Sequence, residues 1–248
     1  TSLNGYKGLV SWTGTAFEYL MPNVNIKRYK GSLLDESSKF AIMSQIDYCK
    51  KLGIPWGISE SAFNLRDLNN NYQYRAFGIP WLGLKRGLEE DMVISPYSTF
   101  LSLEDEPVKA IENLRRIEDD GGVGKYGFYE SIDYTPSRLK ETEKKAVIKT
   151  FMAHHQGLIL LSINNFLNNN IIQKRFFDNP EIEAVDILLQ ERMPIKMIIT
   201  KENKEKVAKS KNIGDSGYIE KIIKKPRKVF TNVNILSNEK YRIIYSKT

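Results

Sequence analysis

The 248-residue sequence contains one cysteine and two histidines. A single cysteine excludes an intramolecular disulfide and a cysteine-based zinc site, so we expect Cys49 to be a small core residue. His154 and His155 are neighbours, and side chains one position apart on a helix point in different directions. We therefore expect no metal site, and no motif indicates another cofactor.

The sequence also lacks a long apolar run. No stretch approaches the roughly 20 apolar residues of a membrane span. The first seven residues show no signal-peptide pattern and no initiator Met, which suggests a fragment or a processed start. Two functional motifs are absent as well. Residues 78–84 are glycine-rich but lack a phosphate-loop pattern, so nucleotide binding has little support. There is no Gly-x-Ser-x-Gly, so serine hydrolase chemistry is not indicated.

The net charge of +7 is unevenly distributed. Residues 201–248 contain 13 Lys and Arg against 5 Asp and Glu, which leaves 24 basic and 25 acidic residues in the first 200. Few aromatic residues accompany the basic ones, so we expect a solvated linker rather than a nucleic-acid site. Binding of this tail to acidic lipid or nucleic acid is the third-ranked hypothesis.

Apolar spacing predicts helices separated by long loops. The helices are expected at residues 11–20, 34–52, 94–104, 107–119, 143–168 and 180–191. Residues 56–90 and 124–139 are expected to be loops, and long ordered loops are usually functional. Residues 229–245 alternate like a β-hairpin.

Four segments, at residues 11–19, 56–61, 126–134 and 152–157, combine titrating or hydrogen-bonding groups with aromatic rings and glycines, as a sugar-binding cleft requires. Cleavage or transfer of a glycosidic bond needs an acid near the leaving oxygen and a second carboxylate as nucleophile or base. Burial against rings raises a carboxyl pKa, which suits a general acid. We prefer Glu130 as the acid and Glu60 as its partner, with Glu18 as a third candidate, although each acid alone also fits a helix cap or a salt bridge.

Other polar and aromatic residues, from these segments and from residues 74–75, are candidates for binding sugar hydroxyls or stacking on sugar rings. Each also fits an ordinary core or surface role. The predicted binding residues are Trp12, Trp56, Tyr74, Arg75, Tyr129, Asp133, Tyr134, His154, His155 and Gln156.

Seven motifs together resemble the glycoamylase-like domain of cyclic β-1,2-glucan synthases, which is related to endo-β-1,2-glucanases. They are SWTGTAFEYLMP (11–22), WGISES (56–61), YQYRAFGIP (72–80), LGLKRGL (82–88), YGFYESIDYTPSR (126–138), FMAHHQG (151–157) and LLQERMP (188–194). A weaker resemblance links residues 233–241 to the β-sandwich that follows this domain in the family.

The resemblance implies a mainly α protein built as an (α/α) toroid of helical hairpins, incomplete in this chain, with a short C-terminal β-hairpin. It implies a helical domain at 1–195, a basic linker at 196–228 and the start of a β-sandwich at 229–248. It also implies a soluble fragment from the cytoplasmic side of a membrane-associated parent, able to complete its ring as a homo-oligomer.

The implied activity is hydrolysis or transglycosylation of β-1,2-glucan by carboxylate chemistry, with the family's acids at Glu60 and Glu130. The alternative is a glucan-binding or structural fragment without turnover, since a full toroid needs about twelve helices and about six are predicted.

Overall fold

The structure is a computed structural model that describes residues 1–3, 5–192, 233–237 and 242–246. The chain divides into two units, Thr1–Glu202 and Asn203–Thr248. In the second unit, β10 (Val233–Ser237) pairs antiparallel with β11 (Arg242–Ser246), as the alternation predicted. The predicted basic linker at 196–228 lies outside the described residues.

Two helices form where their apolar spacing places them. Helix α2 (Leu33–Leu52) begins at Ser32, whose hydroxyl accepts a hydrogen bond from the Asp35 amide, and ends at Gly53 in the left-handed conformation. Helix α4 (Pro107–Asp119) has its proline at the first position, where no amide donor is needed. Both predictions are confirmed.

The other helices are shorter than predicted. The expected helix at 143–168 is wrong in its first part, because residues 146–148 form a strand and the helix begins only at Ala153. The expected helix at 180–191 divides in two. The remaining helices are α1 (Ala16–Leu20), η1 (Met21–Val24), η2 (Leu88–Glu90), α3 (Pro96–Phe100), η3 (Pro136–Arg138), α5 (Ala153–Leu167), α6 (Ile171–Phe177), α7 (Pro180–Glu183) and η4 (Asp186–Gln190).

Strands of small antiparallel sheets lie in the regions predicted to be loops, at β3, β4, β7 and β8, and also outside them. One has three strands in the order β5 (Val93–Ile94), β8 (Ser131–Asp133) and β9 (Ala146–Ile148). A longer hairpin is formed by β3 (Ser61–Arg66) and β4 (Tyr72–Arg75). The remaining pairs are β1 (Ser2–Leu3) with β2 (Tyr6–Lys7), and β6 (Val123–Gly124) with β7 (Gly127–Phe128).

The prediction of a mainly α toroid with a single C-terminal hairpin is therefore wrong. The described residues combine helices with five small sheets, and four of these sheets lie outside the C-terminal hairpin. The error has a physical cause. Strands of two to six residues carry little periodic signal, and β8 pairs with β5 across about 38 positions of sequence.

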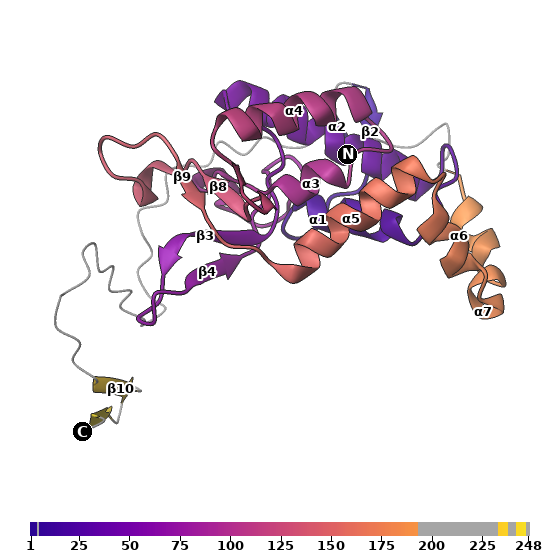
Figure 1. Cartoon of the computed structure of the whole chain (residues 1–248). Coiled ribbons are helices and arrows are strands. Elements are labelled where there is room, and N and C mark those ends of the chain that lie inside the picture. Colours follow the sequence, from indigo (N-terminus) through magenta and orange to yellow (C-terminus); the bar gives the residue numbers. More distant parts are fainter. Residues whose placement is uncertain (4, 193–232, 238–241, 247–248) are drawn as a thin grey trace. The chain divides into compact units, whose positions relative to one another are not determined.

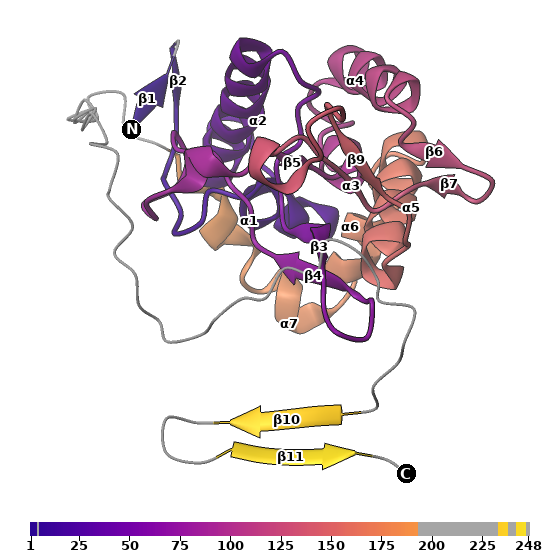
Figure 2. The same ribbon diagram turned by 90° about the vertical axis from the view of Figure 1, so that its left-hand side faces the viewer.

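Helix α3 lies in the interior of the first unit. It contacts α1, α4 and α5, and Figure 1 shows it between α4 and the α1–α5 pair. In Figures 1 and 2, α2 and α4 lie on the same side of this unit. The core is built around fully buried side chains that include Phe40, Phe77 and Tyr97.

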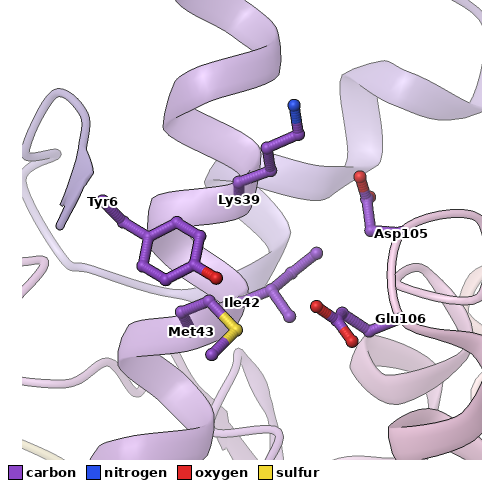
Figure 3. A pocket seen from close by; sticks show the side chains of 6 residues that line it. All are labelled: Tyr6, Lys39, Ile42, Met43, Asp105 and Glu106. Atoms are coloured by element: carbon purple, nitrogen blue, oxygen red, sulfur yellow. The ribbon is translucent and has the colours of Figure 1, made fainter. Parts of the chain in front are cut away.

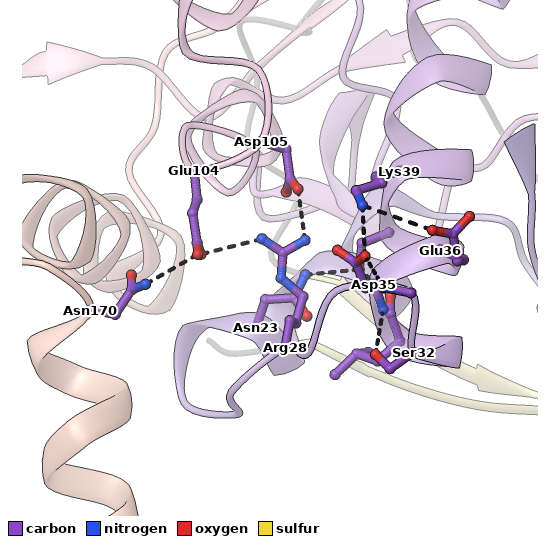
Figure 4. Close-up of polar contacts among 12 residues, drawn as sticks. Asn23, Arg28, Ser32, Asp35, Glu36, Lys39, Glu104, Asp105 and Asn170 are labelled. Carbon is purple, nitrogen blue, oxygen red and sulfur yellow. Dashed lines mark hydrogen bonds and ion pairs between the residues drawn. The ribbon is translucent and has the colours of Figure 1, made fainter. Parts of the chain in front are cut away.

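A buried ion-pair network fastens the loop after η1 to the turn between α3 and α4 (Figure 4). The Arg28 guanidinium lies 2.7 Å from Asp105 Oδ1 and 3.3 Å from Glu104 Oε2. The side chains of Arg28 and Asp105 are less than a tenth exposed. Burial raises the pKa of Asp105 in spite of the neighbouring Arg28 charge. Because a buried charge is costly without its partner, this network holds the loop that carries Arg28 against the turn that carries Glu104 and Asp105.

The segment 11–15 runs beside residues 79–85. Ser11 and Gly83 form a parallel bridge, and the Ile79 amide donates to the Gly14 carbonyl oxygen at 3.2 Å. The close contact between these two segments depends on Gly78, because a Cβ atom there would lie 1.7 Å from the Thr13 carbonyl oxygen.

Candidate active site

Glu130 and His155 form a buried pair. Glu130 is 2% exposed and His155 is 1% exposed. His155 Nδ1 lies 2.9 Å and 3.1 Å from the two carboxylate oxygens of Glu130. The Ala62 amide also donates to Glu130 Oε1 at 3.2 Å. A carboxylate in this position fixes the orientation and tautomer of the imidazole, and leaves His155 Nε2 for another partner.

That partner is Tyr74. Its hydroxyl oxygen lies 3.5 Å from His155 Nε2, and the residue is 41% exposed. Burial, together with the charge of Glu60 and a hydrogen bond with it, holds the pKa of Tyr74 well above its usual value. Tyr74 therefore links the buried pair to the half-buried Glu60. We call Glu60, Tyr74, Glu130 and His155 the acid cluster.

The local folding of three segments brings the acid cluster together. Glu130 immediately precedes β8, His155 lies in the first turn of α5, and the β3–β4 hairpin carries Tyr74 on its second strand. Figure 1 shows this hairpin beside the beginning of α5. The Ser131 hydroxyl donates to the Ala62 carbonyl oxygen, which ties β8 to β3. Pairing between distant segments, not any one motif, creates the site.

His154 is exposed beside the acid cluster, with its ring centroid 4.0 Å from that of His155. Burial and the neighbouring His155 lower the pKa of His154. Among the described residues, no group of three His, Cys, Asp or Glu side chains could hold a metal ion.

Asp133, a predicted sugar ligand, is fully buried and bound within the protein. Its carboxylate lies 2.7 Å from Arg138 Nε and accepts hydrogen bonds from the amides of Asn64 and Thr135. Arg138 pairs with Asp91 as well. The partners of Asp133 are those of a structural ion pair.

Six other predicted binding residues lie away from the acid cluster or already have protein partners. Trp56 is buried, and its backbone is held by Asn113, whereas Trp12 is 66% exposed. The others have the following contacts: Arg75 with Asp91 at 3.6 Å, Tyr129 with the ring of Phe151 at 5.4 Å, and Tyr134 through its hydroxyl with Asp120. Gln156 Nε2, in the first turn of α5, donates to the Phe128 carbonyl oxygen at 3.3 Å.

Glu18 is the third predicted acid, and it caps α1. Its carboxylate accepts hydrogen bonds from the Ser11 hydroxyl at 2.7 Å and the Thr15 amide at 3.0 Å, while the Thr15 hydroxyl accepts one from the Glu18 amide. This is a capping box. Burial favours the protonated form, but the hydrogen bonds from Ser11, Thr13 and Thr15 prevail and lower the pKa of Glu18.

The capping role predicts a pH-dependent contribution to stability. A carboxylate with a lowered folded-state pKa stabilises the fold above its unfolded pKa, and this contribution is lost as the pH falls through the folded pKa. We expect Glu18→Gln to lower Tm by about 2 °C at pH 7, because the exposed charge is screened. The difference from wild type should shrink as the pH falls below the ordinary value of 4.5. Thermal unfolding monitored by circular dichroism at pH 7 and below pH 4.5 checks this. The same difference in Tm between wild type and Glu18→Gln at both values would contradict it.

A cavity of about 210 Å³ lies elsewhere in the first unit. Figure 3 shows its lining, which comes from β2, α2 and the turn before α4, and none of these side chains belongs to the acid cluster. The lining residues are Tyr6, Lys39, Ile42, Met43, Asp105 and Glu106.

Tyr97 and two serines near the acids were not predicted as site residues. Tyr97 stacks on the His155 ring with centroids 3.8 Å apart, and its hydroxyl lies 2.8 Å from Ser59 Oγ. The Ser95 hydroxyl donates to the Glu130 carbonyl oxygen at 2.8 Å. Residues 95–99 follow the pattern of an ordinary short helix, so the sequence carries no signal that they contact the acids.

Comparisons with known proteins identify relatives of much of the chain. The family model Glycoamylase, described as "Putative glucoamylase", matches residues 1–180. The cyclic β-(1,2)-glucan synthase NdvB of Rhizobium meliloti (strain 1021) is 37% identical over 241 residues. This match covers 97% of this chain and only 8% of the synthase.

Solved structures share the fold over part of their length. A glucoamylase-like protein from Bacteroides caccae, described as putative, has a TM-score of 0.51 and 18% identity over 73% of this chain and 42% of its own. An endo-β-1,2-glucanase from Chitinophaga pinensis, solved with sophorotriose and glucose, has a TM-score of 0.53 and 19% identity. That match covers 77% of this chain and 46% of the glucanase.

No helix of the described residues is long and apolar enough to cross a membrane.

Proposed function

Because this chain belongs to the Glycoamylase family, we propose that its acid cluster cleaves or transfers glycosidic bonds of β-1,2-glucan. The resemblance to a glycoamylase-like domain is confirmed, and the relationship to a glucan synthase and a glucanase supports a glucan-acting domain. The observation that carries the proposal is the Glu130–His155 pair, connected through Tyr74 to a second carboxylate, Glu60.

Glu60 is the carboxylate placed to meet a sugar. It is half-buried and borders the exposed Tyr74, whose ring offers a face for stacking. Glu130 is covered, and its oxygens are bonded to His155 and to the Ala62 amide. In this proposal a proton passes from Glu130 through His155 and the Tyr74 hydroxyl to the leaving glycosidic oxygen. Glu60 acts at the anomeric carbon, as nucleophile or as base for the attacking water or hydroxyl.

The other predicted residues divide by what they contact. His154 is exposed beside the cluster and is proposed to bind sugar hydroxyls. Glu18 and Asp133 are left out of the proposed chemistry, because a helix cap and an ion pair with Arg138 already account for their carboxylates. A location on the cytoplasmic side of a membrane-associated parent stays a prediction.

The proposed function is tested with the purified chain and linear β-1,2-glucan. We expect shorter or cyclic glucans as products, and none from β-1,3- or β-1,4-glucan. Calorimetry with sophoro-oligosaccharides separates the alternative, a binding domain without turnover, which would give heat of binding and no product. If the chain gives no product and shows no heat of binding, both the enzymatic function and the binding-domain alternative are contradicted.

A further inference from the structure

Residues 95–99 form a buried polar clamp beneath the acid cluster. The Ser95 hydroxyl donates to the Glu130 carbonyl oxygen at 2.8 Å, and the Ser98 hydroxyl donates to the Gly57 carbonyl oxygen at 3.0 Å. Both serines are fully buried. The clamp therefore contacts the backbone of the segments that carry Glu130 and Glu60.

Tyr97, at the centre of the clamp, contacts both halves of the acid cluster with one side chain. Its ring lies against the His155 ring, at a centroid distance of 3.8 Å and an interplanar angle of 17°. Its hydroxyl donates to the Glu60 carbonyl oxygen at 3.2 Å and lies 2.8 Å from Ser59 Oγ. Tyr97 is 1% exposed, so it acts through these neighbours and does not touch a substrate.

We propose that Tyr97 is a positioning residue that sets Glu60 relative to the Glu130–His155 pair. The ring holds the imidazole that bonds to Glu130, and the hydroxyl holds the backbone of Glu60. This inference rests on the proposed function of the acid cluster.

The chemistry of Tyr97 fits this role better than that of a core residue. A phenylalanine would fill the same space, whereas a buried hydroxyl needs partners, and here they are Ser59 and the Glu60 backbone. The ionisable groups around it are Glu60, Tyr74, Glu130 and His155. Burial and the nearby Glu60 and Glu130 charges raise the pKa of Tyr97 far above neutral pH, so the hydroxyl stays a donor.

The test is Tyr97→Phe, which removes the hydroxyl and keeps the ring against His155. We expect kcat on β-1,2-glucan to fall about 10- to 100-fold with KM changing less than about twofold, because a misplaced carboxylate affects the transition state more than binding. Ser59→Ala, which removes the other hydroxyl at this point, should lower kcat in the same direction without touching either carboxylate.

Tyr19→Phe is the matched control. Tyr19 is also buried, and its hydroxyl donates to the carbonyl oxygens of Leu9 and Leu82, away from the acid cluster. Tyr19→Phe should lower Tm to a similar extent as Tyr97→Phe but leave kcat unchanged. If the wild-type chain is active and Tyr97→Phe has the same kcat, the positioning role alone is overturned. An equal loss of kcat in Tyr19→Phe would overturn it as well. No wild-type turnover would overturn the proposed function and this inference with it.

Discussion

Replacing Glu130 with glutamine is expected to lower kcat on β-1,2-glucan by about 10²- to 10⁴-fold, the usual contribution of a general acid or base. Glutamine preserves the size of the side chain and can still accept from the Ala62 amide. It cannot release or take up a proton at His155 Nδ1, which lies 2.9 Å from Glu130 Oε1. The loss should appear in kcat and not in KM, since Glu130 is 2% exposed and is proposed to act through His155 without touching the sugar.

The measurement is steady-state release of reducing ends, together with circular dichroism to show that the variant is folded. Glu60→Gln should cause a loss of similar size, and the double variant should be little worse than either single one, because groups that act together are not additive. Glu143→Gln is the matched control, since Glu143 lies on the surface and pairs there with the exposed Lys140. A folded Glu130→Gln variant as active as wild type would contradict the proposed chemistry.

Gly78→Ala is expected to destabilise the first unit by about 4 kcal/mol or more, at the extreme of single substitutions. The added Cβ would lie 1.7 Å from the Thr13 carbonyl oxygen and 2.6 Å from the Gly14 carbonyl carbon, and both are backbone atoms. The two segments would have to separate and lose the Ile79–Gly14 hydrogen bond. The capping box of α1 lies on the displaced segment.

Gly157→Ala provides the same chemical change at a site with room. Gly157 lies inside α5, and a Cβ there meets nothing within 4 Å. Since alanine favours a helix, this variant should gain about 0.5–1 kcal/mol. Urea unfolding of both variants gives the free energies of unfolding. If Gly78→Ala unfolds at the same urea concentration as Gly157→Ala, the close packing of these segments is refuted.

Helix prediction succeeded where a helix is long and its own sequence suffices. In α2 and α4, the regular apolar spacing and the terminal signals at Ser32, Gly53 and Pro107 are local properties. The prediction failed for residues 143–148, where apolar residues pair as β9 with β8 instead of continuing a helix. Pairing with a distant strand is not encoded in local periodicity.

The acids show the same limit at the level of side chains. Glu18, Glu60 and Glu130 occur in similar aromatic and glycine-rich contexts, so the sequence ranked Glu130 and Glu60 ahead of Glu18 without showing what each carboxylate contacts. Only the structure shows that Glu18 completes a cap and that Glu130 bonds to His155. Tyr97 could not be found from sequence at all, because its contacts lie 37 and 58 positions away.

The sequence by itself determined the family, the two regular helices and the short set of carboxylates and histidines available for chemistry. These follow from residue identity and local spacing, which can be read from the sequence without knowing any tertiary contact. The tertiary structure alone decided that the fold mixes helices with small sheets, which carboxylates share a cluster, and which already have structural partners. Those outcomes depend on distances between remote segments, because hydrogen bonds, burial and pKa shifts act only over a few ångströms.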